Sequence, residues 1–195
     1  YGMMLQKKSV EELCELFKEE ANQIKEKNFK AMKMKVGLGS KEDLKLVSAV
    51  REAIGDDFKL MVDANHAYNK NDALYVGRGL DEMEIYWFEE PVAPEDYDGY
   101  KELKAKLKTN IAGGEAEFTK YGWNKLIKNN CIDIAQPEVC GLGGITEYLK
   151  VSALAQSNFI PIVNHVWGSA LSVAVNLHLL TSLPDMPGGL FPTKS

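Results

Sequence analysis

Apolar residues recur along the chain in two spacings, one typical of amphipathic helices and the other of short strands. A first helix is predicted to begin after Ser9, because Ser9 and Glu12 have the spacing of a capping box. A second helix is predicted to begin at Ser40 with Asp43. Residues three or four positions apart form the apolar faces: Val10, Leu13, Phe17, Ala21 and Ile24 in the first helix, and Leu44, Val47, Val50 and Ile54 in the second.

Apolar runs between the helical stretches predict the strands. These runs cover residues 29–36, 59–65, 85–90, 110–115, 131–138 and 159–165, and each is followed by a helical stretch. Strand, helix and strand joined by short connections imply parallel strands, because each helix must cross back over the sheet. Two α/β architectures fit this order, an open doubly wound sheet and a (β/α) barrel.

The residues at the ends of the predicted strands favour the barrel. A barrel collects its catalytic groups from the C-terminal ends of many strands, whereas an open sheet concentrates its site at one switch point. Six successive strands end in an ionisable side chain, one strand and one helix apart: Lys35, Asp63, Glu89, Glu115, Glu138 and His165. We therefore predict one TIM-type α/β barrel domain over residues 1–195.

Composition narrows the class of protein. The 195 residues are 45% hydrophobic and 26% charged, with a formal net charge of -5, which fits one globular domain with a sizeable core. No apolar run approaches the roughly 20 residues that span a bilayer, and the first residues lack a signal-peptide pattern. A mildly acidic chain without a basic stripe argues against nucleic acid as the partner. We expect a cytoplasmic protein with no membrane or nucleic-acid partner, and with reduced, structural thiols at Cys14, Cys131 and Cys140.

The predicted strand at residues 29–36 carries two lysines, Lys33 and Lys35, on one face. Side chains alternate along a strand, so Met32 and Met34 lie on the opposite, apolar face. In a barrel the apolar face meets the helices, and the lysines point toward the catalytic rim, where a buried ammonium group needs a partner. The alternative is an edge strand that keeps its lysines in water.

Three acids, Asp63, Glu89 and Glu115, end successive predicted strands at nearly equal intervals. Converging carboxylates repel one another unless a cation lies between them, and a site made only of oxygen ligands suits magnesium. Each acid taken singly could instead be a rim residue or a helix N-cap. The regular spacing of the three favours a shared metal site.

Other polar residues beside these acids are assigned by strand alternation. Asn65 lies on the same face as Asp63 and could hold a ligand or a substrate oxygen, so we assign it to substrate binding. His66 and Glu90 are predicted to face away, and His66 is interpreted as structural. His165 ends its strand where barrels place chemistry, and Glu138 could accept the imidazole N–H and fix its tautomer. The GLGG segment at 141–144 lacks the spacing of a nucleotide-binding loop and is interpreted as a tight turn.

Six motifs occur in order over nearly the whole chain. They are KMK at 33–35, VDAN at 62–65, FEEP at 88–91, GGE at 113–115, QPE followed by GG at 136–144, and NHVWG at 164–168. This ordered set resembles the enolase superfamily, mandelate racemase subgroup, in its C-terminal barrel domain, shared with muconate lactonizing enzyme. DANHAY, WFEEPV, CGLGGITE and HVWGSA look most like acid-sugar dehydratases and galactarolactone cycloisomerases.

The resemblance implies a role for each candidate residue. Asp63, Glu89 and Glu115 would bind Mg2+, and Lys35 would be the base on one face of the substrate. Lys33 would assist, either by favouring the neutral amine of Lys35 or by neutralising a substrate carboxylate. His165, oriented by Glu138, would be the acid or base on the opposite face. The chain departs from the pattern at Glu138, where most similar members have Asp, and at Gly141, where many have a basic residue.

The resemblance also implies a modified (β/α)7β barrel preceded by an N-terminal α+β lid. We expect this chain to be an incomplete barrel, with a partial first strand and without the eighth strand or the lid. The implied reaction removes the α-proton of a small carboxylate substrate through an enediolate, in the dehydration or cycloisomerisation of an acid sugar or its lactone. A homo-oligomer is expected. The alternatives are a racemase or epimerase of a 2-hydroxy acid, a Schiff-base barrel aldolase that uses Lys33 or Lys35, and a non-catalytic binding or structural module.

Overall fold

The computed structural model describes residues 8–184. The chain forms two compact units. The first comprises the residues up to Ala93 together with Ala105–Asn110, and the second comprises Pro94–Lys104 and the residues from Ile111 onward. Both units alternate parallel strands with helices, as the sequence predicts.

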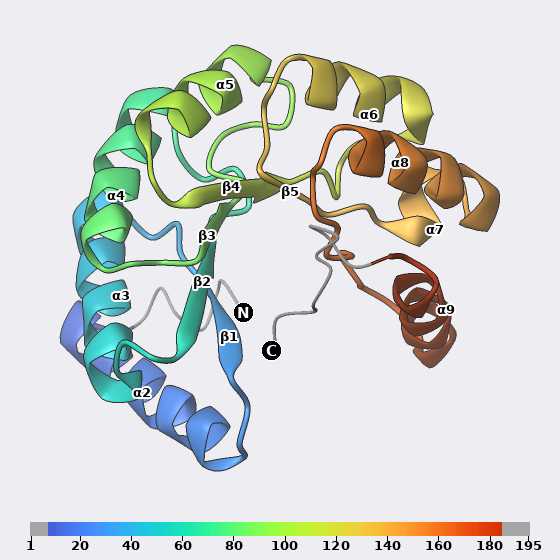
Figure 1. Cartoon of the computed structure of the whole chain (residues 1–195). Helices are drawn as coiled ribbons and strands as arrows, with labels where there is room; N and C mark the ends of the chain where they lie inside the picture. Colours follow the sequence, from blue (N-terminus) through green and yellow to red (C-terminus); the bar gives the residue numbers. More distant parts are fainter. Residues whose placement is uncertain (1–7, 185–195) are drawn as a thin grey trace. The chain divides into compact units, whose positions relative to one another are not determined.

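The first unit places its helices along one side of its strands (Figure 1). In chain order its elements are α2 (Val10–Glu26), β1 (Ala31–Lys35), α3 (Ser40–Ile54), β2 (Lys59–Asp63), α4 (Lys70–Glu82) and β3 (Trp87–Glu89). β2 pairs in parallel with β1 and with β3. The helices and strands enclose a core of fully buried side chains that includes Leu46, Val50, Leu60, Val62 and Phe88. This packing holds the strand ends, and the polar residues on them, in a fixed arrangement.

Strand register brings three predicted site residues into one row. Lys35 lies opposite Asp63 in the β1–β2 pair, and Asp63 lies opposite Glu89 in the β2–β3 pair. Each is the last residue of its strand, as predicted. Paired residues of neighbouring strands point to the same face of the sheet, so these three side chains share one face at its C-terminal edge.

The first helix of this unit begins with the predicted cap, and the second begins at the predicted residue without a side-chain cap. Ser9 Oγ accepts the N–H of Glu12 at 3.1 Å, and Glu12 Oε2 accepts the N–H of Ser9 at 2.7 Å, which is the predicted capping box. At the start of α3 the Asp43 carboxylate accepts the N–H groups of Leu38 at 3.1 Å and Gly39 at 3.0 Å. In α2 the cap satisfies a donor of the first helical turn, whereas in α3 Asp43 fixes the two residues that precede the helix.

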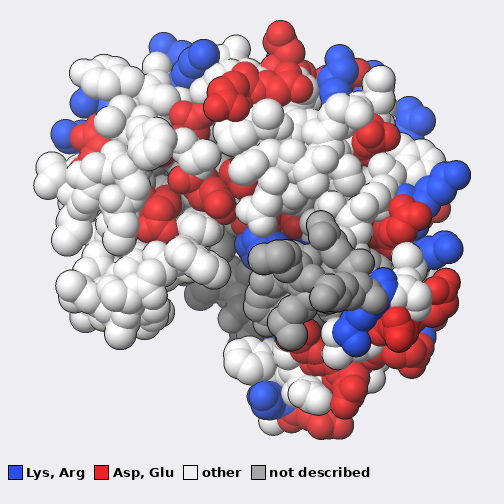
Figure 2. Space-filling view, turned by 180° about the vertical axis from the view of Figure 1, so that it is seen from behind, with Lys and Arg blue, Asp and Glu red and all other residues white. Residues whose placement is uncertain are grey.

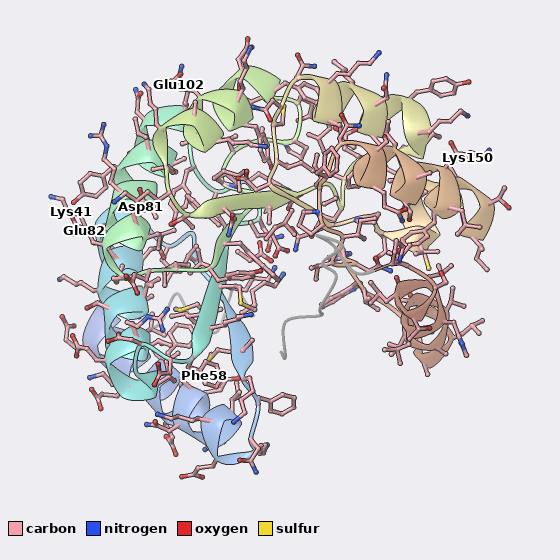
Figure 3. All side chains as sticks on the ribbon, in the orientation of Figure 1. Lys41, Phe58, Asp81, Glu82, Glu102 and Lys150 are labelled. Atoms are coloured by element: carbon pink, nitrogen blue, oxygen red, sulfur yellow. The ribbon has the colours of Figure 1, made fainter. Side chains whose placement is uncertain are left out.

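Residues 105–110 join the first unit through Asp81 of α4, which is labelled in Figure 3. Asp81 Oδ1 accepts the N–H of Thr109 at 2.7 Å and that of Lys108 at 3.0 Å. It also accepts the Thr109 hydroxyl at 2.8 Å. One carboxylate oxygen thus fixes the segment that leads into the next strand.

The second unit contains most of α5 (Tyr97–Lys106) and β4 (Asn110–Gly113), and all of α6 (Thr119–Lys128), β5 (Ile134–Ala135), α7 (Val139–Leu142), α8 (Ile145–Ser157) and α9 (Ala170–Thr181). β4 pairs in parallel with β5. α6 and α8 pack side by side (Figure 1). Glu147 of α8 links them, because it accepts the Lys120 N–H at 2.9 Å and the ammonium of Lys150 at 2.8 Å. Lys150 is labelled on α8 in Figure 3.

All the predicted strands are shorter than the sequence pattern indicates, and two of them are reduced the most. The stretch 131–138 contains only the two residues of β5, and the stretch 159–165 forms isolated parallel bridges at Ile162 and His165. Pro137 and Pro161 lie within these stretches, and proline has no N–H to donate to a ladder. The order of the segments follows the prediction, and the predicted extents are wrong.

Other local predictions concern the GLGG turn, the cysteines and the surface. Gly143 and Gly144, with φ of 123° and 83°, connect α7 to α8, which confirms the predicted turn.

All three cysteines are free thiols. On the face shown in Figure 2, basic side chains are interspersed with acidic ones. Among residues 8–184, no helix combines the length and the apolar character that crossing a membrane requires.

Candidate active site

Lys33, Lys35, Asp63 and Glu89 form one ion-paired cluster in the first unit. Lys33 Nζ lies 2.8 Å from Asp63 Oδ2 and also contacts Glu89 Oε1, and Lys35 Nζ lies 2.5 Å from Asp63 Oδ2. Asp63 and Glu89 have no exposed surface, so their charges need partners of opposite sign. β1 is an edge strand of the described sheet, but its lysines contact buried carboxylates, so the interpretation that they lie only in water is wrong.

The other oxygens of the two carboxylates are also bound. Asp63 Oδ1 accepts the backbone N–H of Asn65 at 3.0 Å, and Glu89 Oε2 accepts the indole N–H of Trp87 at 3.0 Å. The Asn65 side chain contributes Oδ1, which accepts a hydrogen bond from Lys35 Nζ. Both carboxylates are thus held by both of their oxygens, which fixes their direction as well as their charge.

The charges of this cluster shift two pKa values. Burial alone would raise the pKa of Asp63, but hydrogen bonds and positive charge from Lys33 and Lys35 outweigh burial and lower it. Burial alone would lower the pKa of Lys33, but the charges and hydrogen bonds of Glu89 and Asp63 outweigh burial and raise it. Lys33 is therefore an ammonium group near neutral pH, and Asp63 is a carboxylate.

The donor set around Lys33 fits a divalent cation such as Mg2+. Asp63 and Glu89 each direct one oxygen at the same ammonium nitrogen, so the two carboxylates already converge on one cationic point. Both are hard oxygen donors of the kind that Mg2+ prefers. Glu115, the third predicted ligand, belongs to the second unit. Within the described residues of either unit, no three acidic, histidine or cysteine side chains form a metal-sized group, so the three-ligand set stays a prediction.

In the second unit His165 contacts both Glu138 and Glu115. His165 Nδ1 lies 2.7 Å from Glu138 Oε2, and His165 Nε2 lies 3.3 Å from Glu115 Oε2. Glu138 Oε1 accepts the N–H of Cys140 at 3.0 Å, which caps α7, and Oε2 also lies 3.3 Å from the N–H of Trp167. The contact between Glu138 and His165 that the sequence predicts is present. The contact with Glu115 was not predicted.

A glycine places Glu115 just beyond β4. Gly114 has a φ of 119°, a conformation that side chains disfavour, and a Cβ at this position would overlap the ring of Trp123. Trp123 is fully buried, so it has little room to move. The turn that brings Glu115 to His165 therefore depends on a residue without a side chain.

Strand alternation misplaced Glu90 and His66. Glu90 is 1% exposed, and its Oε2 lies 3.4 Å from Asn65 Nδ2 and 3.0 Å from His66 Nε2, so both residues adjoin the cluster. The backbone explains the error, because Glu90 lies past the end of β3 with a φ of 40°, where the two-residue alternation of a strand no longer applies. Pro91 directly follows Glu90 and marks the end of the strand, so the sequence does indicate that strand alternation stops at this point.

The strands, the helices that follow them and the polar groups at the strand ends define an α/β protein of the TIM-barrel type. The chain belongs to the enolase C-terminal domain-like family, whose model matches residues 16–188. This confirms the predicted superfamily and fold class.

Individual relatives agree with the family. The chain is 40% identical over 166 residues to D-galactarolactone cycloisomerase of Agrobacterium fabrum, a match that covers 85% of this chain and 44% of that protein. It is 34% identical over 183 residues to arabinonate dehydratase of Saccharolobus solfataricus, covering 93% and 48%. The chain spans about half the length of the curated relatives that it matches.

Solved structures give the same result. The 3,6-anhydro-D-galactonate cycloisomerase from Zobellia galactanivorans superposes with a TM-score of 0.86 at 48% identity, over 88% of this chain and 49% of that chain. A racemase from Streptomyces coelicolor A3(2) with bound magnesium superposes with a TM-score of 0.80 at 34% identity, over 88% and 50%. The family is therefore supported by sequence and by structure.

Proposed function

We propose that this chain is the barrel domain of an enzyme that removes the α-proton of a carboxylate substrate to form an enediolate. The proposed substrate is an acid sugar or its lactone, and the proposed reaction is dehydration or cycloisomerisation. The observation that carries the proposal is the row of Lys35, Asp63 and Glu89, which sets an amine beside two buried carboxylates. The named activities of the relatives, a lactone cycloisomerase and a sugar-acid dehydratase, support the same class.

The proposed metal ligands are Asp63, Glu89 and Glu115, and Mg2+ bound there would stabilise the negative charge that develops on the substrate carboxylate. Lys35 Nζ is the proposed base, which takes the proton from the α-carbon and becomes an ammonium group. The electron pair of the broken C–H bond stays on the substrate as the enediolate. Lys33 remains charged, since Glu89 and Asp63 raise its pKa, and can offset the charge of the substrate carboxylate.

His165 is the proposed second proton-transfer group. Glu138 accepts the Nδ1–H, which leaves Nε2 as the nitrogen that exchanges a proton with the substrate. In a dehydration, Nε2–H protonates the β-hydroxyl group, the C–O bond breaks with its electron pair, and water leaves. In a cycloisomerisation, a ring oxygen leaves in place of the hydroxyl group. Return of a proton to the α-carbon would instead make the enzyme a racemase or epimerase.

The Schiff-base alternative requires a neutral lysine that attacks a carbonyl carbon. The raised pKa of Lys33 disfavours this role for Lys33. A homo-oligomeric assembly and a cytoplasmic location stay predictions.

Proton exchange in deuterium oxide tests the proposal. The polypeptide that contains this chain, expressed with the flanking sequence of its reading frame, is incubated with MgCl2 and a panel of aldonates, aldarates and their lactones. Loss of the α-proton signal by NMR is expected, and it should require Mg2+ and disappear in the Lys35→Met variant. No exchange across the panel would count against the proposal. Turnover without a metal, with substrate trapped by borohydride, would favour the aldolase, and Mg2+ binding without turnover would favour a binding module.

A further inference from the structure

A second hydrogen-bonded group adjoins Lys35 and contains two residues to which the proposed chemistry gives no role. Glu90 follows β3 directly and is buried, whereas His66, in the loop after β2, has 42% of its side chain exposed. Glu90 Oε2 lies 3.0 Å from His66 Nε2 and 3.4 Å from Asn65 Nδ2. Asn65 in turn contacts Lys35 through Oδ1. A continuous chain of contacts therefore runs from the exposed His66 to the proposed base.

The backbone of this group is strained. Asn65, His66 and Glu90 have φ of 41°, 57° and 40°, in the left-handed region that residues other than glycine rarely adopt. The His66 N–H donates to the carbonyl of Glu90 at 2.8 Å, which ties the two strand ends together in this conformation. Strain of this kind collects where a side chain must be held in an otherwise unfavourable place. Here it holds Asn65 and Glu90 side by side.

The chemistry of the contacts allows only one orientation of the Asn65 amide. A carboxylate accepts hydrogen bonds and donates none, so the NH2 group of Asn65 must face Glu90. The carbonyl oxygen Oδ1 then faces Lys35, which donates to it. With the amide reversed, its NH2 group would face the Lys35 amine and its oxygen would face a carboxylate oxygen.

The orientation of Asn65 decides where the basic electron pair of Lys35 points. A neutral amine has two N–H groups and one lone pair. Asp63 Oδ2 and Asn65 Oδ1 can accept both N–H groups, so the lone pair takes the remaining tetrahedral direction and stays free for a substrate proton. A reversed Asn65 amide would donate to that lone pair and block it.

We propose that Glu90, braced by His66, is a positioning residue that fixes the Asn65 amide and thereby aims the lone pair of Lys35. This inference rests on the proposed function, in which Lys35 is the base. Glu90 acts through Asn65 and does not need to touch the substrate. His66 braces Glu90 through the contact of Nε2 with Glu90 Oε2 at 3.0 Å.

The test compares Glu90→Gln with Glu84→Gln. A glutamine at position 90 keeps the size of the side chain but presents both an oxygen and an NH2 group, so it no longer selects one Asn65 orientation. Glu84 is an exposed residue of the same unit that also has a positive φ, 51°, and serves as the matched control. Both variants are made in the full polypeptide, and their thermal unfolding is measured to exclude misfolding.

Two quantities are measured for each variant: the NMR signals of the Asn65 side-chain amide and the kcat for α-proton exchange. The side-chain amide signals of Asn65, from protein labelled with 15N-asparagine and assigned with Asn65→Asp, should shift or split in Glu90→Gln and stay unchanged in Glu84→Gln. The kcat for α-proton exchange should fall about ten- to a hundredfold in Glu90→Gln, as expected for a misaligned base, and change little in Glu84→Gln. His66→Asn, which tolerates a positive φ but shortens the side chain, should give smaller changes in the same direction.

Unchanged Asn65 amide signals in Glu90→Gln would overturn the inference, even if kcat fell, because Glu90 would then act by another route. A wild-type kcat in Glu90→Gln would overturn it as well. Absence of exchange in the wild-type protein would count against the proposed function instead, and the amide signals would still decide whether Glu90 orients Asn65.

Discussion

Replacement of Lys33 by methionine tests the central ion cluster. Methionine keeps an unbranched apolar stem of similar length but removes the ammonium that contacts both Asp63 and Glu89. Breaking a buried ion pair by removal of one partner destabilises a protein by about 3–5 kcal/mol. Asp63 retains Lys35 and Glu89 retains the Trp87 indole, and part of the Lys33 side chain is exposed. We therefore expect a loss of about 2–4 kcal/mol in the free energy of unfolding at neutral pH.

Urea unfolding followed by circular dichroism measures this loss, with Lys18→Met as the matched control. Lys18 pairs with Glu15 at 3.3 Å on the exposed side of α2, and exposed pairs of this kind contribute about 0–1 kcal/mol. A loss in Lys33→Met no larger than that in Lys18→Met would refute the argument that Lys33 neutralises the buried carboxylates.

The effect of Lys33→Met on the free energy of unfolding should depend on pH. The lysines lower the pKa of Asp63 in the folded protein, so this group stabilises the fold above its unfolded-state pKa, and the stabilisation is lost as pH falls toward the lowered folded-state value. Loss of Lys33 should raise the pKa of Asp63 toward its ordinary range. The difference between wild type and Lys33→Met should therefore be largest near neutral pH and shrink as the carboxylates become protonated.

Three further changes test other features of the fold. Gly114→Ala should lower the free energy of unfolding by about 2–4 kcal/mol, because the added Cβ meets the Trp123 ring and φ is positive. Gly55→Ala is the control. Its φ is also positive but its added Cβ meets open space, so it should lower the free energy of unfolding by only about 1 kcal/mol. The hydrogen bond from Lys150 lowers the pKa of Glu147 to about 2. Ionised Glu147 should therefore stabilise the fold fully above pH 4.5, and this stabilisation should fade as the pH falls toward 2. Glu147→Gln should remove this contribution to the pH dependence of Tm. Burial raises the pKa of Cys131 to about 11, so a thiol reagent at mildly alkaline pH should modify this residue only after unfolding.

The positions of the candidate site residues in the first unit could be predicted from periodicity, because strand ends follow from backbone geometry. Lys35, Asp63 and Glu89 are the last residues of three parallel strands, and parallel pairing alone sets them in one row. The contact between Glu138 and His165 follows in the same way from two neighbouring segments. Lys35, Asp63 and Glu89 could be found from the sequence since each is the last residue of its strand, and Glu138 and His165 form an isolated parallel bridge.

The sequence could not predict the contacts made where regular structure ends. Glu90 and His66 adopt positive φ, so no periodic rule gives the direction of their side chains. Pro137 and Pro161 shortened two segments that are apolar enough to be full strands. In both cases the outcome depends on the backbone of single residues and not on the hydrophobic pattern.

The two proposed proton-transfer groups are positioned by the same device in separate parts of the chain. Asp63 uses Oδ1 to accept the N–H of the residue two positions later, Asn65, and uses Oδ2 to hold Lys35. Glu138 likewise uses Oε1 to accept the N–H two positions later, at Cys140, and uses Oε2 to hold His165. In each case the backbone turn that follows the acid fixes the carboxylate, and the carboxylate fixes the amine or imidazole. The orientation of both groups therefore depends on the local turns as well as on the acids themselves.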